Sequence, residues 1–372
     1  MLSFVAPRPR LPCGQAAERP VGVAGAPRSL YTSTRRMKVL FIGGTGIISS
    51  GVSPVLVERG VELTLLNRGN RDGLAPKGVR HIIADYRDQD AVHAALRGLG
   101  FDVVVNWLVF TAAQLERDIE LFRGRTGQYV FISSASAYQK PPTAFPITES
   151  TPVSNPFFQY SRDKISCEDR LLAELRATGF PMTIVRPSFT YGLTMIPAGY
   201  QSWERPWTTV DRMRRGRKSI VHGDGTSLWT MTHASDFGRA FAGLLGNPRA
   251  LGQTVHITSD EVLTWDQVYR AIGAAAGVEP DIVHIPSDFI SALDPDARGP
   301  LLGDKAHCAV FDNSKIKGLV PGWVATVPFS EGVRRAVEWF EQDPRRQAVD
   351  PAFNERADRI VEAYEKARPG AP

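Results

Sequence analysis

From Met37 onward, short apolar runs alternate with longer amphipathic stretches, and this pattern predicts repeated units of a β-strand followed by an α-helix. We expect strands at residues 38–42, 61–67, 80–84, 103–105, 129–132 and 182–185. Helices are expected at residues 52–60, 89–96, 114–122 and 160–177. The run at 103–105 is valine throughout, as in a central parallel strand buried on both faces. The pattern therefore predicts the α/β class, with a doubly wound parallel sheet.

The pattern changes after Arg186-Pro187, and this change divides the chain. Residues 37–187 carry the regular units and form the predicted sheet domain. Pro, Gly, Trp and Arg become frequent beyond it, so residues 188–345 are expected to form a smaller, irregular substrate-binding lobe, interleaved with late elements of the sheet. Residues 346–372 are expected to form a C-terminal helix and tail, because 353–366 is amphipathic.

Residues 1–36 combine Arg, Pro, Ala and Gly without periodicity, and we expect a disordered N-terminal extension there. Two origins for it stay open. The segment is rich in Arg and poor in acidic residues, as organelle-targeting peptides are. It could equally be a translated upstream extension, because Met37 directly precedes the first predicted strand.

The composition excludes several classes of protein. No apolar run reaches the roughly 18–20 residues of a membrane span. The net charge of +5 arises within residues 1–36, which hold six Arg and one acidic residue, so it does not indicate nucleic-acid binding. Cys13, Cys167 and Cys308 lie far apart, which predicts neither a metal site nor a disulfide framework. Free thiols fit a reducing compartment, so we expect the cytoplasm, with organelle targeting left open.

A glycine-rich loop follows the first predicted strand and opens a helix, which is the context of a dinucleotide phosphate loop. Gly43 would allow the tight turn, and Gly46 would let the backbone approach a pyrophosphate at the helix N-terminus. Ser49, a small residue, takes the place of the third glycine. The remaining loop residues predicted to contact the cofactor are Thr45, Ile47 and Ile48. Residues 37–187 are therefore predicted to bind NAD or NADP.

Three residues after later strands are further candidates for cofactor contacts. Asn67-Arg68 ends the second strand, where an acidic residue would repel the 2′-phosphate of NADP. The pair removes that repulsion and adds a cation, which favours NADP over NAD, although a solvated loop would have similar residues. Asp85 is placed to bind the adenine amino group, and Asn106 to contact the cofactor.

Tyr160 and Lys164 stand four residues apart at the start of a predicted helix, and therefore on one face of it. A tyrosine hydroxyl has a pKa near 10, and a neighbouring ammonium lowers that pKa by stabilising the phenolate. Tyr160 could then exchange a proton with a carbinol or carbonyl oxygen. Ser134, just past the fifth strand, could orient that oxygen from the carboxyl edge of the sheet.

Taken together, these motifs resemble the extended short-chain dehydrogenase/reductase family, also called the NAD-dependent epimerase/dehydratases. The residues that carry the resemblance are the loop 43–49, Asp85, the run 133–138, Tyr160 and Lys164, Arg186-Pro187, Tyr191-Gly192, 223–225, His233 and Asp236. The resemblance implies a Rossmann-type fold, a small-molecule substrate, and Ser134, Tyr160 and Lys164 as the catalytic set. It also implies that Pro187 and Phe189 flank the nicotinamide. A homodimer is left open.

Two departures from the family pattern bear on the substrate. Dehydratases of the family carry an Asp-Glu pair where this chain has Ala135, Ser136 and Ala137, so dehydration is disfavoured. Nucleotide-sugar members carry an Arg for the diphosphate where this chain has Trp229. We therefore expect a less charged substrate. The candidate substrate residues are Ser136, Trp229, Arg215 and Arg217, the last two as an alternative source of positive charge.

The predicted function is hydride transfer at a carbinol or carbonyl carbon of a sugar-like or small hydroxylated substrate, by an NAD(P)-dependent enzyme of the epimerase/dehydratase family with a tyrosine acid/base. An NADP-dependent reductase of a small carbonyl compound is the alternative. A second alternative is an RNA-binding protein, because the chloroplast stem-loop-binding relatives resemble this chain in Asn67-Arg68-Gly69 and in its C-terminal half. Those relatives tend to lose the catalytic tyrosine, and this chain keeps Tyr160, which favours the enzyme.

Overall fold

Seven parallel strands form the central sheet of the computed structural model, which describes residues 36–71, 73 and 75–367. Their order across the sheet is β11-β6-β5-β4-β1-β2-β3. This is the Rossmann order with one strand added beside β6, and it confirms the predicted fold class. The strands are β1 (Lys38–Ile42), β2 (Glu62–Asn67), β3 (Arg80–Ile83), β4 (Val103–Asn106), β5 (Gln128–Ile132), β6 (Met182–Pro187) and β11 (Thr254–Ile257). The expectation for residues 1–36 lies outside the described residues, apart from Arg36.

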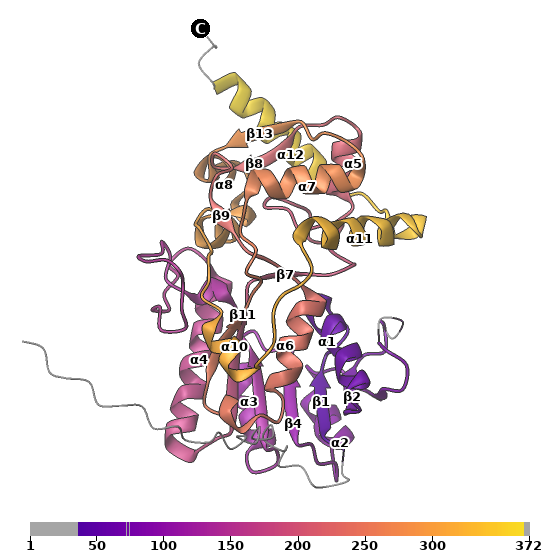
Figure 1. Ribbon diagram of the computed structural model, residues 1–372, viewed down its shortest axis with the longest axis vertical. Helices are drawn as coiled ribbons and strands as arrows, with labels where there is room; N and C mark the ends of the chain where they lie inside the picture. The colour runs from indigo at the N-terminus through magenta and orange to yellow at the C-terminus, as the bar shows by residue number, and fades with distance from the viewer. Residues whose placement is uncertain (1–35, 72, 74, 368–372) are drawn as a thin grey trace, which may run out of the picture. The chain divides into compact units, whose positions relative to one another are not determined.

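Helices cover both faces of this sheet (Figure 1). Alternate residues of β1 point to opposite faces, as the pleat of a strand requires. Val39 and Phe41 pack with α1 and α6, whereas Leu40 and Ile42 pack with α2, α3 and α4. The helices are α1 (Ile47–Glu58), α2 (Gln89–Ala95), α3 (Ala112–Phe122), α4 (Gln159–Thr178) and α6 (Ala234–Leu244).

Helices α1 and α6 lie side by side and approach very closely (Figure 1). A Cβ atom added to Gly51 would lie 2.4 Å from the carbonyl oxygen of Ala234, and one added to Gly238 would lie 2.3 Å from the carbonyl oxygen of Gly51. Neither position can hold a side chain without separating the two helices. The contact fixes α1, whose first turn follows the glycine-rich loop.

The C-terminal part of the chain builds a smaller helical lobe around short strand pairs. Its strands are β7 (Phe189–Tyr191), β8 (Ser219–His222), β9 (Leu228–Trp229), β10 (Met231–His233), β12 (Leu263–Thr264) and β13 (Ile282–Ile285). Its helices are α5 (Thr208–Arg214), α7 (Trp265–Ala276), α8 (Ser287–Leu293), α9 (Arg298–Pro300), α11 (Phe329–Glu341) and α12 (Pro351–Ala367). Helix α10 (Ser314–Leu319) lies outside this lobe and packs on the sheet domain beside β11 and α6 (Figure 1). A π-helical turn spans Leu301–Lys305, and short 3-10 turns span Ala135–Ala137, Pro248–Ala250, Pro295–Ala297 and Pro344–Arg346.

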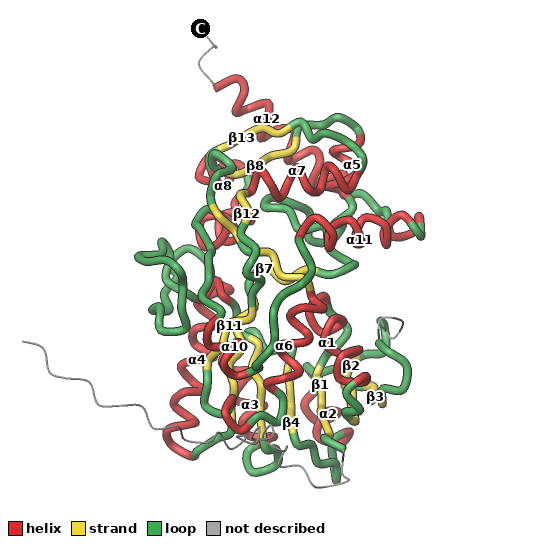
Figure 2. Tube along the Cα trace, in the orientation of Figure 1, coloured by secondary structure: helices red, strands yellow, loops and turns green. Residues whose placement is uncertain are grey.

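The element boundaries agree with the sequence prediction to within a few residues in the sheet domain. The exception is α1, which begins at Ile47 and not at residue 52. Its early start follows from Ser49, whose Oγ accepts a hydrogen bond from the Gly46 N–H and so closes the first turn. Beyond β7 the chain runs without helix or strand from 192 to 207, as the green tube in Figure 2 shows. No helix among the described residues is long and apolar enough to span a membrane.

Candidate active site

Lys164 lies in the second turn of α4, one turn after Tyr160, so both side chains leave the same face of the helix. Its Nζ donates hydrogen bonds to the carbonyl oxygens of Val109 (2.6 Å) and Ile132 (2.8 Å). The same Nζ lies 5.7 Å from the centre of the Tyr160 ring. Burial lowers the pKa of Lys164 to about 8. The cation is therefore held at the carboxyl edge of the sheet, beside the tyrosine.

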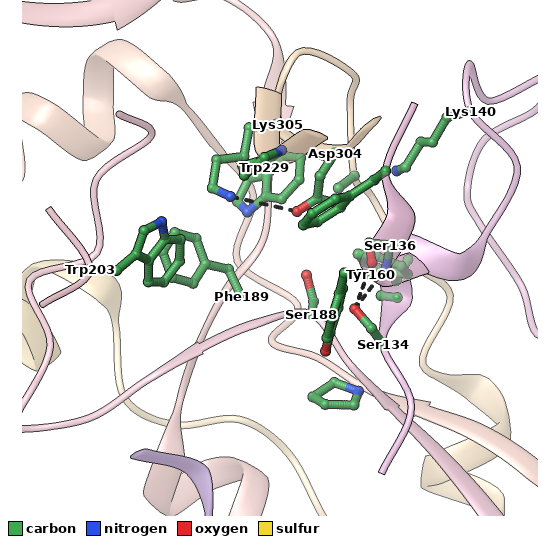
Figure 3. A pocket seen from close by; sticks show the side chains of 16 residues that line it. Ser134, Ser136, Lys140, Tyr160, Ser188, Phe189, Trp203, Trp229, Asp304 and Lys305 are labelled. Atoms are coloured by element: carbon green, nitrogen blue, oxygen red, sulfur yellow. Dashed lines mark hydrogen bonds and ion pairs between the residues drawn. The ribbon is translucent and has the colours of Figure 1, made fainter. Parts of the chain in front are cut away.

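Tyr160 and Ser134 lie together at that edge. Burial raises the pKa of Tyr160 to about 12, and hydrogen bonding with the Ser134 side chain works in the opposite direction. Ser134 directly precedes the 3-10 turn that follows β5, and its Oγ lies 2.9 Å from the Oγ of Ser136 (Figure 3). Ser161, on α4, donates a hydrogen bond to that same Ser136 Oγ at 2.7 Å. A chain of hydroxyls thus leads from Ser134 to α4.

Ser134, Ser136 and Tyr160 line a cavity of about 350 Å³, a volume near the lower end of the range for small-ligand sites. Lys164 is not among the lining residues and lies behind Tyr160. Residues from several elements meet at this cavity because the carboxyl ends of parallel strands lie at one edge of the sheet. The predicted site residues that line it are Ser134, Ser136, Tyr160, Pro187, Phe189 and Trp229. The lining residues that sequence reasoning did not select include Lys140, Phe158, Ser188, Trp203, Asp304, Lys305 and Phe311.

Trp229 forms part of the cavity wall and belongs to the core of the C-terminal lobe. Its ring lies 5.3 Å from that of Trp265, and 2 % of the residue is exposed. Its indole Nε1 is buried and has no hydrogen-bond partner among the described residues. The side chain therefore presents an aromatic face and an unsatisfied donor.

The glycine-rich loop joins β1 to α1 through two consecutive residues with positive φ, Gly43 (+93°) and Gly44 (+98°). A side chain at Gly44 would also meet Leu65, because a Cβ atom there would lie 2.7 Å from its Cδ2. Sequence reasoning missed the steric role of Gly44, although the Gly-Gly pair is a signal for it. Gly46 differs, since a Cβ atom there would approach only the Ser49 Oγ, at 3.6 Å.

This loop fits the pyrophosphate of a dinucleotide. The protein leaves the space over Gly46 open. Ile47 and Ile48 lie in the first turn of a twelve-residue helix, so no earlier helical turn supplies carbonyl oxygens to accept hydrogen bonds from their N–H groups. Thr45 lies between the glycines in the same loop. A free helix N-terminus next to an open backbone is the arrangement that binds phosphate in this type of fold.

The residues at the end of β2 leave two groups available to a ligand. Asn67 Oδ1 accepts a hydrogen bond from the Gly69 N–H (2.8 Å), but its Nδ2 is buried and has no partner among the described residues. Arg68 is exposed, and it forms no hydrogen bond or ion pair with any described residue. Both observations fit a nucleotide ribose at this position.

Asp85 and Asn106 are placed at strand ends as expected, but their side chains already have protein partners. Asp85 pairs with Arg87 at 2.8 Å, and hydrogen bonds from Arg87 lower its pKa to about 2. Asn106 donates to Asp118 (2.6 Å) and accepts from the Leu108 N–H (2.8 Å). Asn106 therefore stabilises the turn after β4.

Arg215 and Arg217 are not among the residues that line the cavity. Arg215 pairs with Asp211 one turn earlier on α5 (2.9 Å), and Arg217 pairs with Asp358 on α12 (3.3 Å). These ion pairs neutralise the two positive charges that were predicted to bind a substrate. The positive charge in the cavity comes instead from Lys140 and Lys305. These two lysines are 165 positions apart in the sequence and belong to no common motif, so no local pattern indicates that they lie in one cavity.

Comparisons with known proteins show the family and the fold of the chain. Residues 39–258 match the model of the NAD dependent epimerase/dehydratase family. The chain is 27% identical to the 2′-dehydrokanamycin reductase of Streptomyces kanamyceticus over 77% of this chain and 80% of that protein. It is 30% identical to the chloroplast stem-loop binding protein of 41 kDa b of Arabidopsis thaliana, over 70% of each chain. The crystal structure of the UDP-glucose 4-epimerase of Bifidobacterium longum with NAD+ and UDP has the same fold, with a TM-score of 0.67, 18% identity and coverage of 83% and 100%.

Proposed function

The chain belongs to the NAD dependent epimerase/dehydratase family of extended short-chain dehydrogenase/reductases, and we propose that it transfers hydride at a carbinol or carbonyl carbon of a sugar-like or small hydroxylated substrate. The enzyme class follows from the family, whose members are NAD-dependent epimerases, dehydratases and reductases. The observation that carries the proposal is that Tyr160 and Ser134 line one cavity, with the Lys164 cation beside the tyrosine ring.

In the proposed mechanism Tyr160 is the acid/base. Its pKa of about 12 keeps the hydroxyl protonated at neutral pH, so it can donate a proton to a carbonyl oxygen as that oxygen gains negative charge. Ser134 donates a second hydrogen bond to the same oxygen and so orients the substrate. Lys164 stabilises the phenolate that remains on Tyr160.

A bound nicotinamide would supply the hydride acceptor or donor for this reaction. The proposed contacts to the dinucleotide come from the loop 43–48, from Asn67 and Arg68, and from Pro187 and Phe189 beside the nicotinamide. We propose that Arg68 favours NADP, because its exposed guanidinium forms no hydrogen bond or ion pair with a described residue and could bind the 2′-phosphate. In this proposal Lys164 also reaches the nicotinamide ribose. Asp85 and Asn106 would contribute chiefly by shaping the strand ends.

Epimerisation and simple reduction need the same proton transfer, whereas dehydration also needs an acidic side chain for the elimination of water. Among the described residues that line the cavity, Asp304 is the one carboxylate, and it lies 3.7 Å from Lys305. The positions after Ser134 supply no acid for elimination of water. A reductase is the second candidate, and the 27% identity to a dehydrokanamycin reductase favours it.

An RNA-binding function is the candidate from another class, and the 30% identity to a stem-loop binding protein is its support. The retained set of Ser134, Tyr160 and Lys164 favours the enzyme, because RNA binding gives no reason to keep a phenol and a hydroxyl at one cavity with a buried ammonium beside the phenol ring. The two functions make opposite predictions for cofactor and RNA binding.

Titration of the purified protein with NADH and NADPH, followed by nicotinamide fluorescence, tests the proposal. A panel of sugars, polyols and their oxo forms, followed by nicotinamide absorbance, then tests turnover. We expect saturable binding of at least one dinucleotide and turnover of at least one panel member. Retention on an RNA column without dinucleotide binding would support the RNA-binding alternative and contradict the enzyme.

A further inference from the structure

Two lysines are buried in the wall of the candidate active-site cavity, and the proposed proton transfer uses neither of them. Lys140 and Lys305 are each 4 % exposed, and burial lowers the pKa of both. Lys140 Nζ forms no hydrogen bond or ion pair with any residue that the structure describes. An ammonium removed from water is costly unless it is hydrogen-bonded or paired. The attraction of Asp304 offsets part of this cost for Lys140, and the missing hydrogen bonds indicate an absent ligand in the cavity.

The backbone around Lys305 is built to hold this side chain in place. Lys305 ends the π-helical turn Leu301–Lys305, a rare geometry that is frequent at functional sites. Its carbonyl oxygen accepts hydrogen bonds from His222 Nε2 (2.8 Å) and Trp265 Nε1 (3.1 Å). Both donors come from elsewhere in the C-terminal lobe, so three segments fix one residue.

Two hydrogen bonds from Asn155 connect this turn to residues 134–136, called here the Ser134 segment. Asn155 Nδ2 donates to the carbonyl oxygens of Gly303 (2.6 Å) and Ser136 (2.8 Å), and Asn155 is buried. The spacing between the lysine turn and the Ser134 segment is therefore fixed by one side chain. A substrate that contacts both the lysine turn and the Ser134 segment would therefore find its two binding sites already at a fixed distance from each other.

The charges that face the cavity do not balance. Lys305 lies 3.7 Å from Asp304, and Lys140 is close enough to Asp304 for that carboxylate to raise its pKa against the effect of burial. Two cations thus share one carboxylate, which leaves one positive charge. Figure 3 shows Lys305, Asp304 and Trp229 grouped together, with Ser134 and Tyr160 on another side of the labelled side chains.

The other walls of this site are aromatic. Lys305 Nζ lies 5.3 Å from the ring centres of both Phe189 and Trp203, and Trp229 lies in the same cavity. Aromatic faces can cover the apolar side of a sugar or a carbon chain. A cavity of about 350 Å³ has room for such a small molecule.

We propose that the cavity binds its substrate through a compact anionic group, a carboxylate or a phosphate monoester, paired with Lys140 and Lys305. The inference rests on the proposed function, in which the same substrate presents its reacting oxygen to Tyr160 and Ser134. Trp229 and Phe189 cover the carbon skeleton between the two ends. The substrate class is therefore a small hydroxy or oxo acid, or the phosphate ester of a small sugar or polyol.

Calorimetry with gluconate, glucose 6-phosphate and uncharged glucose, on protein saturated with NADP+ or NAD+, tests the proposal. We expect at least one of the two anions to bind about tenfold or more tightly than glucose, as a charge-assisted hydrogen bond would give. The gluconate and phosphate arms show which acid the site prefers. Equal affinity for glucose and both anions, or no binding of either anion, would overturn the proposal.

Substitution of the lysines links any preference to this site. Lys305→Gln and Lys140→Gln should each remove most of the preference for the anion, and Lys305→Arg should keep more of it than Lys305→Gln. Lys317→Gln is the matched control, because Lys317 forms an exposed ion pair with Asp260 and does not line the cavity. An anion preference that survives both glutamine substitutions would contradict the assignment.

Dinucleotide affinity and melting temperature, measured on the same variants, separate this proposal from the proposed function. If the unsubstituted protein bound no dinucleotide, that result would contradict the proposed function itself. Normal dinucleotide binding with no preference for anions would contradict only the anion site. A lysine variant that melts early but keeps its affinity for glucose still reports on the preference.

Discussion

Burial sets the protonation states of the two residues at the centre of the candidate active site. It raises the pKa of Tyr160 to about 12 and lowers that of Lys164 to about 8, because a charged side chain is less stable away from water in each case. At neutral pH the tyrosine therefore holds its proton and the lysine holds its charge. This is the state needed to protonate a carbonyl oxygen, so the reduction direction should be favoured near neutrality.

The lysine predicts a pH dependence. Lys164 is charged below about pH 8 and loses its charge above it, while Tyr160 stays protonated up to about 12. In the reduction direction kcat/KM should be flat below about pH 8 and should fall as the pH rises through this value, because kcat/KM follows the groups of the free enzyme. Rates measured across this range check it.

Lys164→Arg is the control for this profile, because a guanidinium keeps its charge across the same range. The variant should lose the break near pH 8 even if its rate is lower throughout. An unsubstituted enzyme whose profile stays flat to about pH 10, the ordinary range for lysine, would contradict the lowered pKa of Lys164 in the reacting enzyme.

Arg68 gives a prediction about the cofactor. Its guanidinium is exposed and forms no ion pair with a described residue, so its removal should cost little stability. Arg68→Ala should weaken NADPH binding more than NADH binding, by roughly 1–3 kcal/mol, the worth of a hydrogen bond to a charged group. Fluorescence titration of both cofactors measures the difference. Arg97→Ala, at another exposed arginine, should change neither affinity, and equal losses for both cofactors in Arg68→Ala would refute the role.

Single residues also show which site features a sequence can reveal. Tyr160 and Lys164 were predictable because one turn of helix relates them, and Ser134 because it follows an apolar strand. Lys140 and Lys305 carry no such local relation, and only the packing of the C-terminal lobe onto the sheet joins them in one cavity. The partner of Asp85 was not foreseen either, since a flexible arginine two residues away leaves no pattern.

At the scale of whole elements, the sheet domain follows closely from apolar periodicity. Buried strands such as β4 and β5 are continuous apolar runs, and little else in the chain has that pattern. The short strands β9 and β12 have two residues each, too few for a periodicity to develop. The close approach of α1 and α6 was also not predicted, because Gly51 and Gly238 lie far apart in the sequence and neither has a positive φ.

That helix contact gives a prediction about stability. Gly238→Ala should destabilise the fold by about 1–3 kcal/mol, the usual effect of overpacking, because its Cβ would lie 2.3 Å from the Gly51 carbonyl oxygen. Since α1 carries the phosphate loop, dinucleotide affinity should fall as well. Thermal melting and cofactor titration measure the two effects.

Gly318→Ala is the matched control for this substitution. Gly318 lies in α10, and a Cβ atom there would meet nothing within 4 Å. Alanine is the better helix former, so this change should be neutral or slightly stabilising. Equal melting temperatures for the two variants would mean that the α1–α6 contact yields easily to an added methyl group.

On the scale of the whole molecule, the candidate active site depends on folding distant parts of the chain against one edge of the sheet. Ser134 and Tyr160 come from the sheet domain, whereas Trp229 and Lys305 come from the lobe that follows it. The resemblance to the extended short-chain family predicted the Rossmann-type fold, which the seven-stranded sheet and the family match confirm. The cavity volume and its charge depend on side-chain packing in the lobe, where the sequence shows no regular pattern.

The central claim is that Tyr160 transfers the proton in a nicotinamide-dependent reaction. Tyr160→Phe removes one hydroxyl and keeps the ring that packs on Phe158, so the fold and dinucleotide affinity should be unchanged. Tyr364→Phe, at a tyrosine on α12 outside the cavity, is the matched control and should keep full turnover.

The decisive measurement is the turnover of Tyr160→Phe with its best substrate, compared at equal cofactor saturation with the unsubstituted enzyme. We predict a loss of about 10²-fold or more, the usual contribution of a general acid/base. Turnover close to that of the unsubstituted enzyme, with cofactor binding intact, would contradict the account.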